Sequence, residues 1–161
     1  MRRRFCLPND MLMFLAVILF DQLIKIVVKL SMVPGESITV VRDVFHLTFV
    51  LNPGAAFGIM ENQRLFFVLA GIIVIAAAFC MYPAIRKMDR WMHYGVMALL
   101  GGAVGNLIDR IESGLVVDYL DFRFWPVFNL ADIAIVIGVG SMLYSILFLG
   151  EGSQRKRRNI R

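Results

Sequence analysis

The stretch 65–85, LFFVLAGIIVIAAAFCMYPAI, contains no charged side chain. A helix that crosses the hydrocarbon core of a bilayer needs about 20 consecutive apolar residues, so this stretch by itself indicates a membrane protein. Three further apolar stretches run over 11–30, 91–108 and 130–149. The sequence therefore predicts an all-α integral membrane protein with four transmembrane helices.

The overall composition agrees with a bilayer as the solvent. Of the 161 residues, 59% are hydrophobic and 18% are charged, which is a larger apolar share than soluble proteins have. The length suits one domain. We expect residues 1–150 to form a single four-span domain and the basic tail 151–161 to be disordered.

The positive charges predict how the chain lies in the membrane. They cluster at 2–4, 86–90 and 155–161, and cytoplasmic segments carry the excess of Lys and Arg. Both termini are therefore expected in the cytoplasm and the segments 31–64 and 109–129 outside. We expect the first span to be retained, since no small-x-small cleavage site follows it. We attribute the net charge of +5 to the basic cytoplasmic segments and their contact with membrane lipids, and not to nucleic-acid binding.

The two outer segments have their own structure. Residues 37–51, SITVVRDVFHLTFVL, are rich in β-branched and aromatic residues, which favour strands, and Arg42-Asp43 is placed for a turn between two of them. We expect a small extracytoplasmic β-sheet on the membrane surface. The segment 122–128, FRFWPVF, has the aromatic content of a membrane interface.

Ionisable side chains in or beside apolar stretches are costly and mark functional sites. Five aspartates stand in such positions, and the predicted topology brings all of them to the outer half of the membrane. They are Asp21, Asp109, Asp118, Asp121 and Asp132.

Several of these aspartates have a structural explanation. Asp21 and Lys25 are four residues apart, acid first, which favours an ion pair on a helix. Asp109 is followed by Arg110, and Asn106 shares their face of the predicted helix. We expect Asp21 and Asp109 to be charge-compensated by these neighbours and to hold the helices in place.

The remaining aspartates are better candidates for proton chemistry. Asp118 and Asp132 have no basic residue beside them, whereas Asp121 is close to Arg123. Asn129 lies three residues before Asp132 and can face the same site. Asp132 also begins a predicted helix, where an anion is favoured.

The chemistry that fits these residues is acid–base catalysis by two carboxylates. No Ser-His-Asp arrangement, phosphate-binding loop or metal-ligand spacing is present in the sequence, and we expect no metal or organic cofactor. Two aspartates that share one proton can activate water and polarise a peptide carbonyl. The residues by themselves narrow the pair but do not decide it.

Two other classes of function remain open at this point. A proton-coupled membrane transporter component also uses buried aspartates, although it favours polar residues near the midplane and repeated halves. A membrane scaffold could be built on the small-residue run 101–105, GGAVG, for which close helix packing is the expected role.

Five motifs in order resemble those of the bacterial lipoprotein signal peptidase family, also called signal peptidase II. They are DQLIK (21–25), NPGAAFG (52–58), GGAVGNLIDR (101–110), VDY (117–119) and FNLAD (128–132). The resemblance implies an intramembrane aspartic endopeptidase whose catalytic residues are Asp118 and Asp132. It implies supporting roles in the active site for Asn52, Gly54, Asn106, Arg110 and Asn129, and structural roles for Asp21 and Lys25.

The same resemblance implies a substrate and a location. The expected substrates are prolipoproteins whose lipobox Cys carries a diacylglyceryl group, cut on the N-terminal side of that Cys. The expected location is the bacterial inner (cytoplasmic) membrane, with the active site near its outer face. The resemblance also implies inhibition by cyclic peptide antibiotics, and we expect a monomer.

Overall fold

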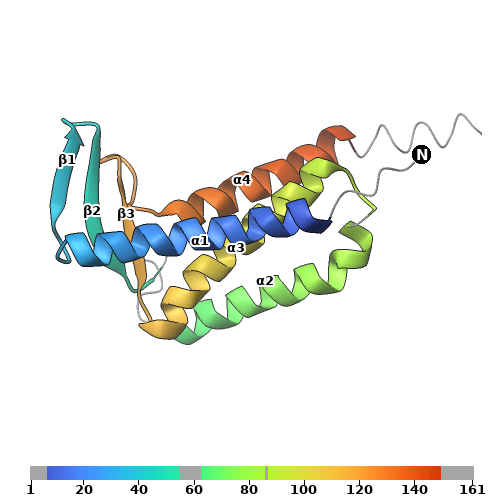
Figure 1. Cartoon of the computed structure of the whole chain (residues 1–161), viewed down its shortest axis with the longest axis horizontal. Coiled ribbons are helices and arrows are strands. Elements are labelled where there is room, and N and C mark those ends of the chain that lie inside the picture. Colours follow the sequence, from blue (N-terminus) through green and yellow to red (C-terminus); the bar gives the residue numbers. More distant parts are fainter. Residues whose placement is uncertain (1–6, 55–62, 86, 150–161) are drawn as a thin grey trace, which may run out of the picture.

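The computed structural model describes residues 7–54, 63–85 and 87–149. These residues form a bundle of long helices with a small sheet at one end (Figure 1). The tail 151–161, for which disorder is expected, lies outside the described residues, as do the last four residues of the 52–58 motif.

Each predicted apolar stretch lies within a helical segment of the structure. The helices are α1 (Leu7–Ser31), α2 (Arg64–Ile85), α3 (Arg90–Glu112) and α4 (Leu130–Tyr144), and α4 continues as a short π-helical segment, η2 (Ser145–Leu149). The start of α1 and the end of α4 lie at the end of the bundle opposite the sheet (Figure 1).

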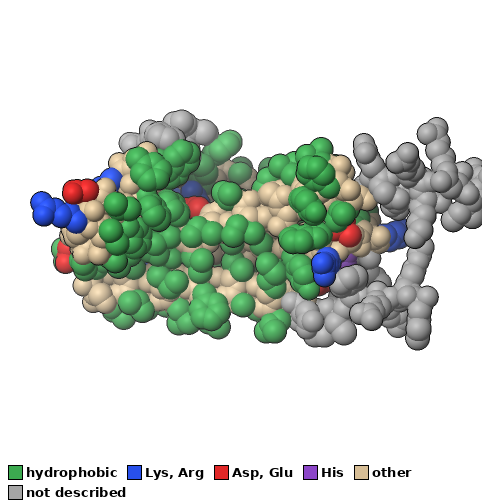
Figure 2. Space-filling view, turned by 90° about the horizontal axis from the view of Figure 1, so that it is seen from above, with side chains coloured by type: hydrophobic (Ala, Val, Ile, Leu, Met, Phe, Trp, Pro, Cys, Tyr) green, Lys and Arg blue, Asp and Glu red, His purple; other side chains and the backbone are tan. Residues whose placement is uncertain are grey.

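Three of these helices are long and apolar enough to cross a membrane. They are α1 from Asp10, α2, and α4 with its π-helical extension. Hydrophobic side chains cover most of the bundle surface seen in Figure 2, and charged side chains gather mainly toward its ends. The fourth helix, α3, carries more polar residues, so the count of four spans stays a prediction.

Helix α3 is the centre of the bundle. It packs against α1, α2 and α4, whereas α2 packs chiefly against α3. Glycines allow the close approach that the GGAVG run predicted. A side chain at Gly102 would overlap the backbone carbonyl of Ala131, and a Cβ at Gly105 would lie 2.6 Å from the Asp21 carboxylate. The packing role of this run is confirmed.

The sheet has three antiparallel strands in the order β1 (Ser37–Val41), β2 (Phe45–Asn52) and β3 (Val116–Asp121). The predicted hairpin is confirmed, with Asp43 in the left-handed backbone region at φ +59° in the turn. The third strand was not predicted. It matters because it carries Asp118.

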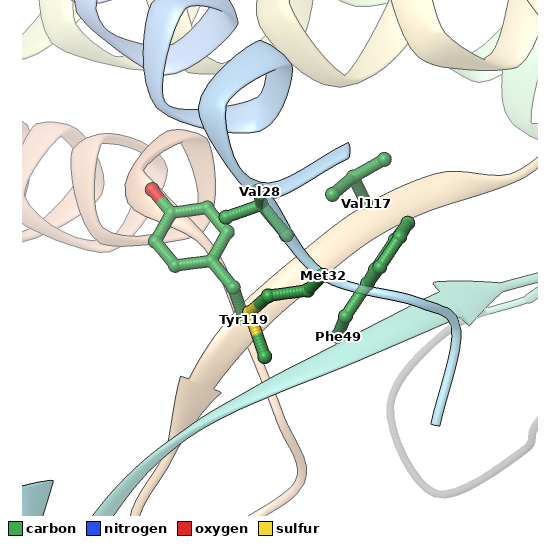
Figure 3. Close-up of a cluster of buried hydrophobic side chains, with 5 residues drawn as sticks. All are labelled: Val28, Met32, Phe49, Val117 and Tyr119. Atoms are coloured by element: carbon green, nitrogen blue, oxygen red, sulfur yellow. The ribbon is translucent and has the colours of Figure 1, made fainter. Parts of the chain in front are cut away.

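A buried apolar cluster joins the sheet to the helices. It consists of Val28 from α1, Met32 just after the end of α1, Phe49 from β2, and Val117 and Tyr119 from β3 (Figure 3). Since Val117 and Tyr119 flank Asp118, the cluster fixes that residue relative to α1.

Candidate active site

Six of the predicted site residues line one cavity at the sheet end of the bundle. Its volume is about 390 Å³. These residues are Asn52, Gly54, Asn106, Arg110, Asp118 and Asp132, whereas Asn129 lies behind Asp118 and does not line the cavity. Apolar residues of α2, α3 and α4 form much of the walls, including Phe67, Ala70, Val74, Leu107 and Ile135, and the segment 125–128 also contributes. Segments far apart in the sequence therefore form a single site.

Asp118 is buried on β3 and accepts two amide hydrogen bonds. Asn52 Nδ2 donates to its Oδ2 at 2.8 Å and Asn129 Nδ2 donates to its Oδ1 at 2.7 Å. Only 2% of Asp118 is exposed. Burial, reinforced by the negative charge of Asp132, raises the pKa of Asp118 to about 7. This carboxyl group can therefore hold a proton at neutral pH.

Asp132 lies in the first turn of α4 and also has a donor on each oxygen. Asn106 Nδ2 donates to Oδ1 at 2.8 Å, and the backbone N–H of Asn129 donates to Oδ2 at 3.2 Å. Asn129 and Asp132 form a reciprocal capping box at this helix start. The carboxylate therefore faces the positive end of the helix dipole.

The three asparagines are oriented by groups that can only donate. The side-chain oxygen of Asn52 accepts from the Gly54 N–H at 2.9 Å, and that of Asn129 accepts from the Asp132 N–H at 3.0 Å. The oxygen of Asn106 accepts from the Lys25 ammonium at 2.9 Å. In each case the amide nitrogen is left facing an aspartate. The site therefore presents a fixed set of neutral donors to its two carboxylates.

Comparison with known proteins identifies the family that shares this arrangement. Residues 13–148 match the family model described as signal peptidase (SPase) II. The chain belongs to the signal peptidase II family. The lipoprotein signal peptidase of Pelotomaculum thermopropionicum is 46% identical over 142 residues, covering 88% of this chain and 93% of that protein. That of Halothermothrix orenii is 48% identical over 129 residues, covering 80% and 88%.

Solved structures support the fold of this signal peptidase II family member. A bacterial membrane enzyme solved by the in meso method superposes with a TM-score of 0.84 at 30% identity, covering 91% of this chain and 92% of that one. Family membership supports a peptidase and not the transporter alternative.

Beside the cavity, the signal peptidase II chain holds a second buried polar cluster. Lys25 Nζ lies 2.9 Å from Asp21 Oδ2 and 2.8 Å from Asp109 Oδ2, and Lys25 is fully buried. The predicted pair of Asp21 and Lys25 is confirmed. Gln22, which sequence reasoning did not assign to a site, donates to the Gly105 carbonyl at 3.0 Å and to Asp109 at 3.3 Å. Gln22 could have been identified from the sequence as a polar residue next to an aspartate within an apolar stretch.

Arg110 is not the ion-pair partner of Asp109 that the sequence suggests, and the charge of Asp109 acts on it more weakly than those of Asp132 and Asp118. Successive residues on a helix point about 100° apart, so these two side chains leave α3 in different directions. Arg110 lines the cavity, where its Nη2 donates to the Gly54 carbonyl at 3.2 Å and its guanidinium stacks 4.6 Å from the centre of the Phe67 ring. The compensating charge for Asp109 is Lys25, 84 positions away in the sequence.

Asp121 does not line the cavity with Asp118 and Asp132. Burial acts to raise the pKa of Asp121, but its hydrogen bonds from Thr48 Oγ1 at 2.7 Å and from the Arg123 N–H at 2.8 Å outweigh burial and lower that pKa. The predicted proximity of Asp121 and Arg123 is confirmed, with 3.6 Å between the charged groups. Asp121 belongs to the polar side of the sheet.

Tyr119 supports the site in a way that its sequence position did not reveal. Its hydroxyl oxygen accepts from the Leu130 N–H at 3.1 Å, and burial raises its pKa to about 12. Tyr119 therefore ties β3 to the start of α4, the two elements that carry Asp118 and Asp132.

Proposed function

We propose that the protein is an intramembrane aspartic endopeptidase in which Asp118 and Asp132 are the catalytic residues. The observation that carries the proposal is the convergence of these two carboxylates on one cavity, each with a hydrogen-bond donor on both oxygens. Membership in the signal peptidase II family supports it. Asn52, Asn106 and Asn129 orient the pair, and Arg110 with Gly54 forms the polar rim.

The local environments divide the two catalytic roles. Asp118 is the more deeply buried carboxyl and carries the shared proton, and Asp132 at the helix start is the base in this proposal. Asp132 takes a proton from water as the water attacks the peptide carbonyl. Asp118 donates its hydrogen to the carbonyl oxygen, and a proton then passes to the leaving nitrogen.

The substrates that we propose are prolipoproteins whose lipobox Cys carries a diacylglyceryl group, cut on the N-terminal side of that Cys. Two features support this choice. The relatives are named lipoprotein signal peptidases, and the cavity walls of α2, α3 and α4 are apolar, which suits the hydrophobic part of a signal peptide. Cyclic peptide antibiotics that resemble the substrate are the proposed inhibitors.

The proposed topology has four spans and both termini in the cytoplasm of a bacterium, in its inner membrane. With 23 residues, α3 is about 34 Å long at 1.5 Å per residue, enough for a core of about 30 Å. Its polar residues face the other helices, as the burial of Asn106 and Asp109 indicates. The active site then lies near the outer face, in one domain that works as a monomer.

The test is cleavage of a defined substrate by the purified protein. A diacylglyceryl-modified prolipoprotein and its unmodified form are incubated with the enzyme, and the cut position is read by mass. We expect cleavage next to the lipidated Cys only. Asp118→Asn and Asp132→Asn should each abolish turnover while the protein stays folded in the membrane. Turnover by either purified variant would refute the proposed catalytic pair.

A further inference from the structure

Lys25 makes a side-chain hydrogen bond in addition to its two ion pairs. An ammonium group has three N–H donors, and in this structure Nζ of Lys25 has three acceptors within 2.9 Å: Asp21, Asp109 and the side-chain oxygen of Asn106. Two of these contacts belong to the structural cluster. The third connects that cluster to the proposed catalytic pair.

Asn106 is held in one amide orientation by its neighbours. Its oxygen accepts from Lys25 at 2.9 Å and from Asn129 Nδ2 at 3.1 Å, while its nitrogen donates to Asp132 at 2.8 Å. If the amide were reversed, two donors would face its nitrogen and the Asp132 carboxylate would face its oxygen. All three hydrogen bonds would be replaced by repulsive contacts.

The Lys25 contact is the stronger of the two that fix the oxygen. It is shorter and charge-assisted, whereas the Asn129 amide also donates to Asp118 and is shared between two sites. Without Lys25, the side-chain oxygen of Asn106 would keep only that shared neutral donor.

We infer that Lys25 is a positioning residue for the proposed reaction, because it holds Asn106 so that the amide nitrogen of Asn106 faces Asp132 and fixes the position of this carboxylate. This inference rests on the proposed function. It gives Lys25 a role besides charge compensation, and the role is exerted through Asn106 without contact with the substrate.

The role predicts a loss of kcat with little change in KM. Because Asn106 acts on Asp132, a misoriented Asn106 should slow the step in which Asp132 accepts a proton from water. Among the described residues, the other charged groups that face Asp132 are Arg110 on α3 and Asp118 on β3, and both are retained in the variants below.

The experiment compares Lys25→Met, Asn106→Leu and the double variant in the full-length protein. With a diacylglyceryl-modified peptide, kcat and KM are measured across the pH range. We expect each single variant to lower kcat by about tenfold or more, which is the loss of one hydrogen bond to a charged group, with little change in KM.

The double variant distinguishes two ways in which Lys25 could affect turnover: by orienting Asn106, or by the electrostatic field of its own charge. If Lys25 acts through Asn106, the double variant should be about as slow as the slower single variant, because both changes remove the same hydrogen bond. If Lys25 acted independently, the two losses would multiply and the inference would be wrong. Lys29→Met is the matched control, since Lys29 is the next lysine on α1 and is partly exposed beside Glu112; its pH profile should be that of the wild type.

Removal of a buried ammonium can prevent folding, because it leaves the carboxylates uncompensated. The paired variant Lys25→Met with Asp21→Asn keeps the net charge of the cluster, and Asp21→Asn alone is its reference. Folding is followed by size-exclusion chromatography and thermal unfolding. A lower kcat at an unchanged KM in the paired variant relative to Asp21→Asn supports the inference, whereas an identical kcat refutes it. If only Asp21→Asn folds, Lys25 acts on the fold and the positioning role is refuted.

The outcomes for the inference and for the proposed function are distinct. A wild-type enzyme that does not cleave the lipidated peptide at any pH refutes the proposed function and the inference with it. A wild-type enzyme that cleaves, together with a folded Lys25→Met variant whose kcat is unchanged, refutes the inference alone.

Discussion

Replacement of Asn52 by Leu should move the basic limb of the pH–rate profile. Asn52 Nδ2 donates to Asp118 at 2.8 Å, and this hydrogen bond favours the ionised carboxylate. Asp118 must be protonated to act on the carbonyl oxygen, so activity falls as pH rises through its pKa of about 7. Without the donor the neutral form is favoured, the pKa rises, and the limb moves to higher pH.

The structure also sets the size of the effect. A hydrogen bond to a charged group contributes about 1.5–3 kcal/mol, and one pH unit corresponds to about 1.4 kcal/mol. Asn129 continues to donate to the other oxygen of Asp118 at 2.7 Å. We therefore expect a shift near the lower bound, about one pH unit.

The assay is the rate of cleavage of a lipidated peptide from about pH 5 to pH 10, measured under saturating substrate so that kcat is followed. Thr48→Val is the control, because Thr48 lies on the same strand and donates to Asp121 outside the cavity. Its basic limb should match the wild type. A limb that stays in place or moves to lower pH in Asn52→Leu would contradict both the assignment of the proton to Asp118 and the reasoning on its hydrogen bonds.

Three further predictions concern stability. In the wild type, the pKa of Asp118 is raised above its ordinary value of 3.8, so its contribution to stability is present below pH 3.8 and is lost as pH rises through about 7. Asp118→Asn should therefore raise Tm relative to the wild type more at pH 8.5 than at pH 4.5. An equal difference in Tm at the two pH values would contradict this prediction. Gly102→Ala should lower the free energy of unfolding by about 1–3 kcal/mol, because the added methyl group overpacks against Ala131. Gly140→Ala is the control and should not destabilise the protein, since no atom lies within 4 Å of its added Cβ. Equal Tm values of the two variants in detergent would show that α4 moves aside at no cost. Asp21→Asn should reduce folded yield more than kcat, as judged by size-exclusion chromatography and cleavage of the lipidated peptide, and a well-folded but inactive protein would contradict the structural role.

The helices and the hairpin could be predicted because their signals are local. An uncharged run such as 65–85 has few alternatives to a membrane helix, and the β-branched residues of 37–51 favour strands whatever surrounds them. Strand β3 gave no such signal. It is short, and two of its six residues are aspartates, a type depleted in strands; its pairing with β2 and burial on α1 are tertiary effects.

The site was predictable in part for the same reason. The pair of Asp21 and Lys25 is one helical turn apart and could be read directly. The contact between Lys25 and Asp109 joins two helices, so sequence adjacency suggested Arg110 as the partner of Asp109 instead. The residues by themselves also left the catalytic pair open. Asp118 and Asp132 were selected by resemblance, and their common cavity became visible only in the structure.

Helix α2 supplies one wall of the cavity through Phe67, Ala70 and Val74, yet it packs chiefly against α3. Its position beside the bundle is visible in Figure 1. A lipid-anchored substrate would meet this wall by lateral diffusion within the bilayer, without passing through water. The concentration that governs its encounter is therefore the number of substrate molecules per lipid. Dilution of the membrane with extra lipid should slow cleavage even when the bulk concentrations of enzyme and substrate are unchanged.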